Sequence, residues 1–154
     1  MFREMRRKDK MLTKEEMMEI LNNAEYGIIS TIGEDGWPYG VPVNFVFNDN
    51  KIYFHAALTG HKLENISYSN KVSFCTVTDV ELLPADFSTK FKSVIAFGEV
   101  SEVKEEQKND IYTLILEKFS KDFIPSGQEY VKADGPKAKV FQIDVQHMSA
   151  KGKK

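Results

Sequence analysis

The chain opens with an apolar pattern at helical spacing. Thr13 and Glu16 match the capping box T-x-x-E, in which each residue satisfies a backbone N–H of the first helical turn. The apolar side chains that follow recur every three or four residues and fall on one face of a helix: Met17, Ile20, Leu21 and Ala24. The pattern predicts an amphipathic helix that starts after Thr13.

Beyond this helix the periodicity changes to the alternation that is typical of strands. Turn residues separate the first strands, at Gly33–Gly36 and at Asn48–Asn50. The predicted strands are Tyr26–Ile32, Tyr39–Phe47, Lys51–Ala57, Lys71–Asp79, Phe91–Val103 and Lys139–Met148. Their short connections favour a mainly β fold with an antiparallel six-stranded sheet or barrel over a parallel, doubly wound fold.

Helical patterns are inserted between these strands. A short helix is expected to begin near Gly60, and a longer one spans Glu105–Phe119. Residues 120–138 contain proline and glycine and are expected to be mostly loop, with a helical turn at Gln128–Lys132. The length suggests one domain over residues 1–154, with residues 1–10 as a basic, solvated arm.

Composition narrows the possible partners and compartments. The net charge of −2 gives no general attraction to nucleic acid, and no apolar run is long enough to cross a membrane. The single Cys75 excludes an internal disulfide and is expected to be a buried, inert thiol. Since the first residues lack the apolar core of a signal peptide, a cytoplasmic protein is expected.

Sequence motifs for several common activities are missing. The chain has no GxGxxG motif after a strand and no P-loop GxxxxGK[ST], so neither nucleotide site is suggested. No His, Asp and Glu spacing is typical of a metal site, and no GxSxG or Ser-His-Asp arrangement is present.

The stretch FHAALTGHKLENI, residues 54–66, contains the most informative polar residues. Thr59 is a candidate N-cap, and Gly60 would let a ligand approach the backbone at the start of the following helix. Free N–H groups and the helix dipole favour an anion there, and His61 and Lys62 add donors of the right sign. The residues predict a phosphate-binding corner, with an ordinary solvated helix terminus as the alternative.

The two strands before this corner could hold a flat ring. Pro42 cannot donate to a sheet ladder, so its strand is expected to lie at an edge or to be bulged there. Asn44 points to the same face as Pro42 and offers an amide to a heterocycle. On the next strand His55 shares a face with Tyr53, and the small Ala56 allows close approach.

Five segments in this order carry a resemblance to a known family: MRRKDK, YGIISTIGEDGWPYGVPVNFVF, KIYFHAALTGHKLENI, KVSFCTVTD and SVIAFGEVSEV. The chain resembles the FMN-binding split-barrel superfamily of pyridoxamine 5′-phosphate oxidase, and within it the 5-nitroimidazole-resistance (Nim-type) proteins. The resemblance implies a six-stranded split barrel and a homodimer that holds FMN at the subunit interface.

The resemblance also assigns residues. His61 and Lys62 match the Arg-Lys pair that holds the flavin phosphate, and His55 matches a histidine of functional importance in Nim-type proteins. The further cofactor contacts that it implies are Pro42, Val43, Asn44, Phe45, Phe54, Ala56 and Asn65. Two features depart from the family pattern: the phosphate pair is His-Lys, and the C-terminal substrate residues of the oxidases have no match.

Two functions follow from this assignment. One is a flavoprotein reductase that passes electrons from a nicotinamide donor to a small acceptor such as a nitroaromatic, with His55 as its catalytic residue. The other is a non-catalytic dimer that stores or senses flavin or haem, with His55 or His61 as a haem ligand. A deazaflavin is a third possible cofactor.

Overall fold

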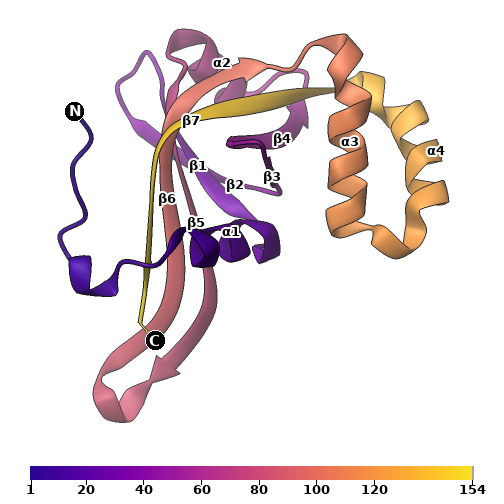
Figure 1. Ribbon diagram of the computed structural model, residues 1–154. Coiled ribbons are helices and arrows are strands. Elements are labelled where there is room, and N and C mark those ends of the chain that lie inside the picture. The colour runs from indigo at the N-terminus through magenta and orange to yellow at the C-terminus, as the bar shows by residue number, and fades with distance from the viewer. Residues whose placement is uncertain (154) are drawn as a thin grey trace.

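The computed structural model describes residues 1–153, which form one antiparallel sheet with four helices (Figure 1). The strand order is β2-β1-β5-β6-β7-β4-β3. The strands are β1 Gly27–Ile32, β2 Pro38–Val43, β3 Val46–Asn48, β4 Lys51–Ala57, β5 Lys71–Leu83, β6 Ser88–Glu102 and β7 Ala138–Gly152. The helices are α1 Lys14–Asn23, α2 His61–Tyr68, α3 Glu105–Phe119 and α4 Ile124–Asp134.

The mainly β, antiparallel fold is confirmed, but the expected number of six strands is wrong, because the described residues form a seven-stranded sheet. The predicted strand Tyr39–Phe47 divides into β2 and β3, which pair with β1 and β4 and form the two edges of the sheet. The division falls where alternation fails, because the consecutive residues Phe45 and Val46 are both buried. Pro42 lies on the edge strand β2, as its missing N–H requires.

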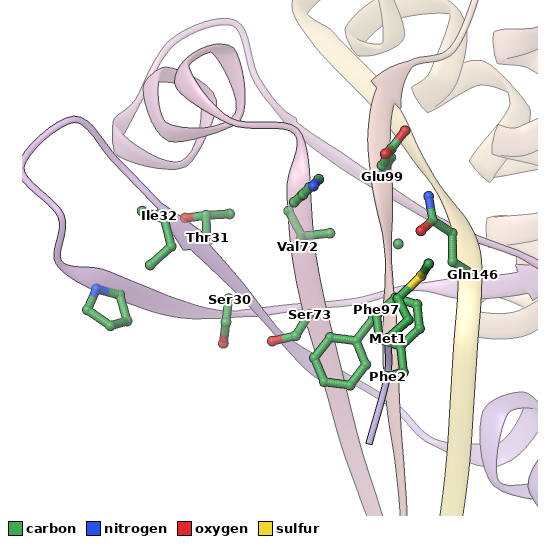
Figure 2. A pocket seen from close by; sticks show the side chains of 13 residues that line it. Met1, Phe2, Ser30, Thr31, Ile32, Val72, Ser73, Phe97, Glu99 and Gln146 are labelled. Atoms are coloured by element: carbon green, nitrogen blue, oxygen red, sulfur yellow. The ribbon is translucent and has the colours of Figure 1, made fainter. Parts of the chain in front are cut away.

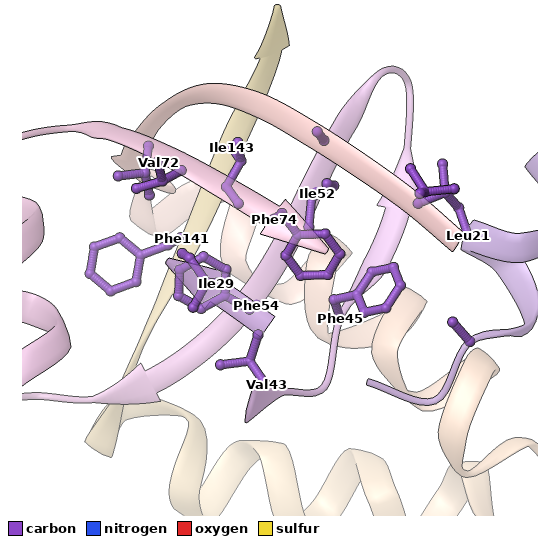
Figure 3. Packing of buried hydrophobic residues seen from close by; sticks show 14 of the residues in the cluster. Leu21, Ile29, Val43, Phe45, Ile52, Phe54, Val72, Phe74, Phe141 and Ile143 are labelled. Carbon is purple, nitrogen blue, oxygen red and sulfur yellow. The ribbon is translucent and has the colours of Figure 1, made fainter. Parts of the chain in front are cut away.

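The sheet curves around an apolar core that also receives α1 (Figure 3). The side chains of Phe45, Phe54 and Phe74 are fully buried, and the rings of Phe45 and Phe74 meet edge-on with centroids 4.8 Å apart. Leu21 of α1 is also fully buried. The predicted capping box at Thr13 is present, so local chemistry fixes the start of the helix that covers this core.

The chain between β6 and β7 folds as a pair of helices beside the sheet (Figure 1). Helix α3 has the predicted bounds. The helical turn predicted at Gln128–Lys132 lies within α4, but the loop expected over most of residues 120–138 is wrong, because α4 extends well beyond this turn. Pro125 lies in the first turn of α4, where a missing N–H costs nothing. Gly127 allows close packing on α3, since a Cβ there would lie 2.5 Å from Leu116.

The strands β5 and β6 extend beyond their predicted ends and form a long hairpin that projects from the sheet (Figure 1). A 3₁₀ turn at Pro84–Asp86 closes it. In the part of the chain that the structure describes, no helix is long and apolar enough to cross a membrane.

Candidate functional site

The candidate site is built around the start of α2. Gly60 is its N-cap and has φ of 147°, a backbone conformation that favours glycine. The expected N-cap Thr59 is wrong, because no side chain caps this helix. Since the first intrahelical bond is donated by Glu64 to Gly60, the earlier N–H groups of α2 have no intrahelical acceptor. The helix therefore presents uncapped donors and its positive dipole end to the surface.

His61, the first residue of α2, is fixed by an aromatic contact. Its ring stacks on Tyr39 of β2 with centroids 4.0 Å apart and planes inclined by 26°. The stack joins the edge strand β2 to the start of α2. The sequence interpretation did not include Tyr39; its only sequence signal was an aromatic side chain on the strand expected beside the ligand.

Lys62, the second residue of α2, lies near an aromatic ring of β4. Its Nζ lies 5.8 Å from the centroid of the Phe54 ring, and burial lowers the pKa of the amine. No ion pair to Lys62 occurs among residues 1–153. A half-buried cation that lacks a carboxylate partner is available to a bound anion.

His55 lies on the outward face of β4, close to Lys62. Its pKa is lowered, first by burial and second by the positive charge of Lys62. Part of the ring remains open to solvent, although the protein around it removes enough water to disfavour the charged form. Within the described residues the imidazole makes no hydrogen bond. A neutral imidazole at pH 7 offers a ligand both a donor and an acceptor.

His55 also faces a cleft between the sheet and the pair α3 and α4. This cleft has a volume of about 250 Å³. Its lining includes His55, Tyr112, Leu116, Ser120, Tyr130 and Asp134. Tyr112 is held in place because its hydroxyl donates to the Gly135 carbonyl over 3.1 Å. The sequence interpretation missed these walls because it treated the segment of α4 as loop.

The residues assigned to the flavin at the end of β2 and in its connection to β3 divide into two groups. Pro42 and Asn44 are exposed, and Asn44 Nδ2 donates to the Glu25 carbonyl over 2.8 Å, which orients the amide. Val43 and Phe45 belong to the buried core. Only Pro42 and Asn44 therefore present side chains to a surface ligand, while Val43 and Phe45 could contribute backbone groups.

The remaining assigned residues are mainly internal. Phe54 and Ala56 point into the core from β4, opposite to His55. Asn65 is buried, and its Nδ2 donates to Thr31 Oγ1 over 3.0 Å. Gly33 packs closely on this amide, because a Cβ there would lie 2.3 Å from Asn65 Oδ1. Its side chain joins α2 to β1.

Three further side chains of chemical interest are Trp37, His147 and Cys75. Trp37 is 74% exposed on the β1–β2 turn, and His147 is half-buried beside Phe2. Cys75 is half-buried, and burial raises the pKa of its thiol. Among residues 1–153, no group of three or more His, Cys, Asp or Glu side chains is arranged to hold a metal ion.

A larger cavity, about 470 Å³, lies elsewhere, on the outer face of the sheet (Figure 2). It shares no lining residue with the His55 cleft. Its lining includes none of the residues at the start of α2, so it is separate from the donors that could hold an anion.

The corner fits the phosphate end of a flavin nucleotide. It combines uncapped helix N–H groups, a glycine at the point of approach and the unpaired Lys62. These are the donors that a phosphate dianion requires, and the exposed β2 edge beside His61 leaves room for a longer ligand.

Comparison with known proteins assigns the family. The profile of pyridoxamine 5′-phosphate oxidase matches residues 13–152, and the chain belongs to this family. No protein of curated function matches the sequence.

Solved structures share the fold at low sequence identity. A candidate 5-nitroimidazole antibiotic resistance protein from Bacteroides thetaiotaomicron is 22% identical with a TM-score of 0.76, covering 93% of this chain and 86% of its own. An FAD-binding protein from Mesorhizobium loti is 17% identical with a TM-score of 0.70, over 94% and 98%. A haem storage protein from Vibrio cholerae is 16% identical with a TM-score of 0.68, over 90% and 94%.

Proposed function

We propose that this protein binds FMN as a homodimer and acts as a reductase of a small acceptor such as a nitroaromatic compound. The observation that carries the proposal is the corner where the uncapped start of α2, the unpaired Lys62 and the unbonded His55 meet. Family membership and the flavin-binding and nitroimidazole-resistance neighbours support it.

Each residue of the corner has a distinct role in this proposal. Lys62 and the first N–H groups of α2 hold the phosphate, and the Tyr39–His61 stack keeps these groups in position. Pro42 and Asn44 line the β2 edge along the ring system. The bound flavin supplies the redox chemistry, and the protein supplies binding and electrostatics.

His55 serves the acceptor. Its cleft of about 250 Å³ is smaller than the roughly 300–1,000 Å³ of pockets that enclose drug-sized ligands. It therefore suits a compact acceptor and not a whole flavin nucleotide. The neutral imidazole orients that acceptor by a hydrogen bond and can exchange a proton with it.

A second copy of the chain is the proposed partner. Apolar side chains on the β5–β6 hairpin are exposed in the single chain: Val77, Val80, Leu82 and Ile95. Such a group of apolar side chains favours an interface with another protein surface. Sedimentation of the purified protein tests this part, with the mass of a dimer expected.

The cofactor is tested by titrating the protein with FMN and following flavin fluorescence. We expect saturable binding at micromolar concentrations. Lys62→Met should weaken it by about tenfold or more through loss of a charge-assisted contact. Lys132→Met, which removes an exposed lysine of α4, is the matched control and should bind normally. No binding at tens of micromolar FMN would refute the proposal.

Reductase activity is tested on the FMN-loaded protein. Oxidation of NAD(P)H should depend on a nitroimidazole or quinone acceptor. His55→Gln should lower turnover while FMN binding stays close to wild type. Equal turnover in wild type and His55→Gln would remove the proposed role of this residue.

A haem-binding function is the second candidate. The unbonded imidazole of His55 favours it, because such a group could serve as an axial ligand. A Soret band that forms with haemin and is lost in His55→Leu would support it, particularly if FMN fails to bind.

A further inference from the structure

The cavity of about 470 Å³ on the outer face of the sheet holds the aromatic side chain of Phe2 (Figure 2). The ring of Phe2 stacks on His147 with centroids 5.1 Å apart and planes inclined by 6°. It also stacks on Phe97, at 5.3 Å and 27°. Phe97 and His147 are paired across β6 and β7, so they form a platform on the outer face of the sheet.

This platform is covered by a weakly attached segment. No hydrogen bond or ion pair within residues 1–153 joins residues 1–7 to the sheet; the first backbone connections are the Met11–Lys151 bridge and the bond from the Leu12 amide to the Ala150 carbonyl. The ion pairs of Lys8 with Glu4 and of Arg7 with Asp9 lie inside the segment. The Phe2 stack is thus the main contact there, and it can open without unfolding the sheet.

The cavity is suited to a flat ring. Its volume of about 470 Å³ lies within the range of small-molecule sites, and its walls are mostly apolar. Ser30, Ser73 and Gln146 line it, and their side chains make no hydrogen bonds in the described part of the chain. Lys71 and Glu99 also line it with opposite charges, which favours a ligand without net charge.

We infer that this cavity is a second ligand site for an uncharged planar aromatic molecule, and that Phe2 occupies the ring position until a ligand displaces it. The phenyl ring shows that the platform accepts a ring at stacking distance. The unbonded hydroxyl and amide groups would recognise hydrogen-bonding atoms at the ligand edge. The site shares no lining residue with the His55 cleft, and none of the residues assigned to FMN lines it.

The test uses the protein of residues 1–154 and prodan, an uncharged planar naphthalene whose emission shifts to the blue in an apolar site. Phe2→Ala removes the competing ring and should bind prodan about tenfold more tightly than wild type. Phe123→Ala, which removes a phenyl ring that is 68% exposed just before α4, is the matched control and should leave binding unchanged.

Double variants test whether prodan binds on the Phe97–His147 platform. Phe2→Ala combined with His147→Leu, or with Phe97→Leu, should lose the gain because each removes one ring of the platform. Saturating FMN should not displace prodan, so failure of FMN to bind would leave this test intact.

Three results would overturn the inference. They are equal affinity in wild type and Phe2→Ala, retained tight binding in both double variants, or displacement of prodan by FMN. An increase in sedimenting mass of Phe2→Ala without tighter prodan binding would also overturn it, since the cavity would then be a protein–protein surface.

Discussion

The ring of His61 at the start of α2 lies flat against Tyr39 of the edge strand β2, with the two centroids 4.0 Å apart. This contact joins positions 39 and 61, which are 22 residues apart in the sequence. Because His61 is the first helical residue, the stack also orients the uncapped N–H groups that follow Gly60.

Tyr39→Leu should therefore weaken both folding and FMN binding. Loss of the stack is expected to lower the free energy of unfolding by about 1 kcal/mol and FMN affinity by about fivefold. Urea denaturation and fluorescence titration measure the two effects. Tyr68→Leu, at the other end of α2 and 58% exposed, is the control. If Tyr39→Leu bound FMN like Tyr68→Leu, the stack would have no part in the site.

Lys62→Met should raise the pKa of His55. The positive charge of Lys62 disfavours a second charge on the nearby imidazole, and its removal leaves burial as the remaining cause of the lowered pKa. An NMR titration of the His55 ring protons measures the change, with Lys132→Met as control. An unchanged His55 titration in Lys62→Met would show that the two groups are not coupled.

The lowered pKa of His55 also sets a pH dependence of stability. The folded state favours the neutral ring, so between the folded pKa and the unfolded value near 6.5 the unfolded state binds more protons. This contribution to stability is present above pH 6.5 and is lost as the pH falls through the folded pKa. As the pH falls from 6.5 through the folded pKa, wild type should lose more stability than His55→Gln. Urea denaturation of both proteins at several pH values checks this expectation. A constant difference would contradict this account.

Asn65→Ala should destabilise the protein whether or not FMN is present. The buried amide donates to Thr31 Oγ1 over 3.0 Å, and its loss leaves a buried hydroxyl without this partner. We expect a loss of about 1–3 kcal/mol in urea denaturation. Asn22→Ala, at an exposed position of α1, should stay within about 0.5 kcal/mol of wild type. A stable Asn65→Ala with weakened FMN binding would instead support the contact implied by the family resemblance.

Lys118 of α3 should make stability increase with alkaline pH. Its Nζ donates to the Phe45 carbonyl over 2.9 Å and lies 4.0 Å from the centroid of the Phe45 ring. Burial lowers the pKa of this amine to about 8, against 10.5 for an ordinary lysine. Between these values the unfolded state binds more protons, so this group adds stability as the pH rises.

Comparison with Lys118→Met isolates this contribution. We measure the free energy of unfolding of both proteins by urea denaturation at pH 7.5 and at pH 9.5. The difference in stability between wild type and Lys118→Met should shift in favour of wild type at pH 9.5. A parallel pH dependence of the two proteins would show that the amine does not titrate in this range.

Local patterns predicted the elements whose signals lie within a few residues. The capping box of Thr13 and Glu16 defines α1, and Asp49 and Asn50 form the predicted hairpin turn with positive φ angles of 51° and 59°. Pro42 indicated an edge strand because a missing N–H excludes a central position.

Tertiary packing decided what the sequence could not show. Alternation continues through Asn44, yet burial of both Phe45 and Val46 divides the strand. Pro125 and Gly127 are typical of loops, but one begins α4 and the other allows it to pack on α3. For the site, His61 and Lys62 were predicted to act as a pair, whereas one stacks on Tyr39 and the other points toward the Phe54 ring.

The central claim is that the start of α2 holds a flavin phosphate, and calorimetric titration with FMN and with riboflavin tests it most directly. The two ligands differ only in the phosphate group. Wild type should prefer FMN by about 30-fold or more, and Lys62→Met should reduce that preference by about tenfold while Lys132→Met keeps it. Equal affinity of wild type for FMN and riboflavin would contradict the account.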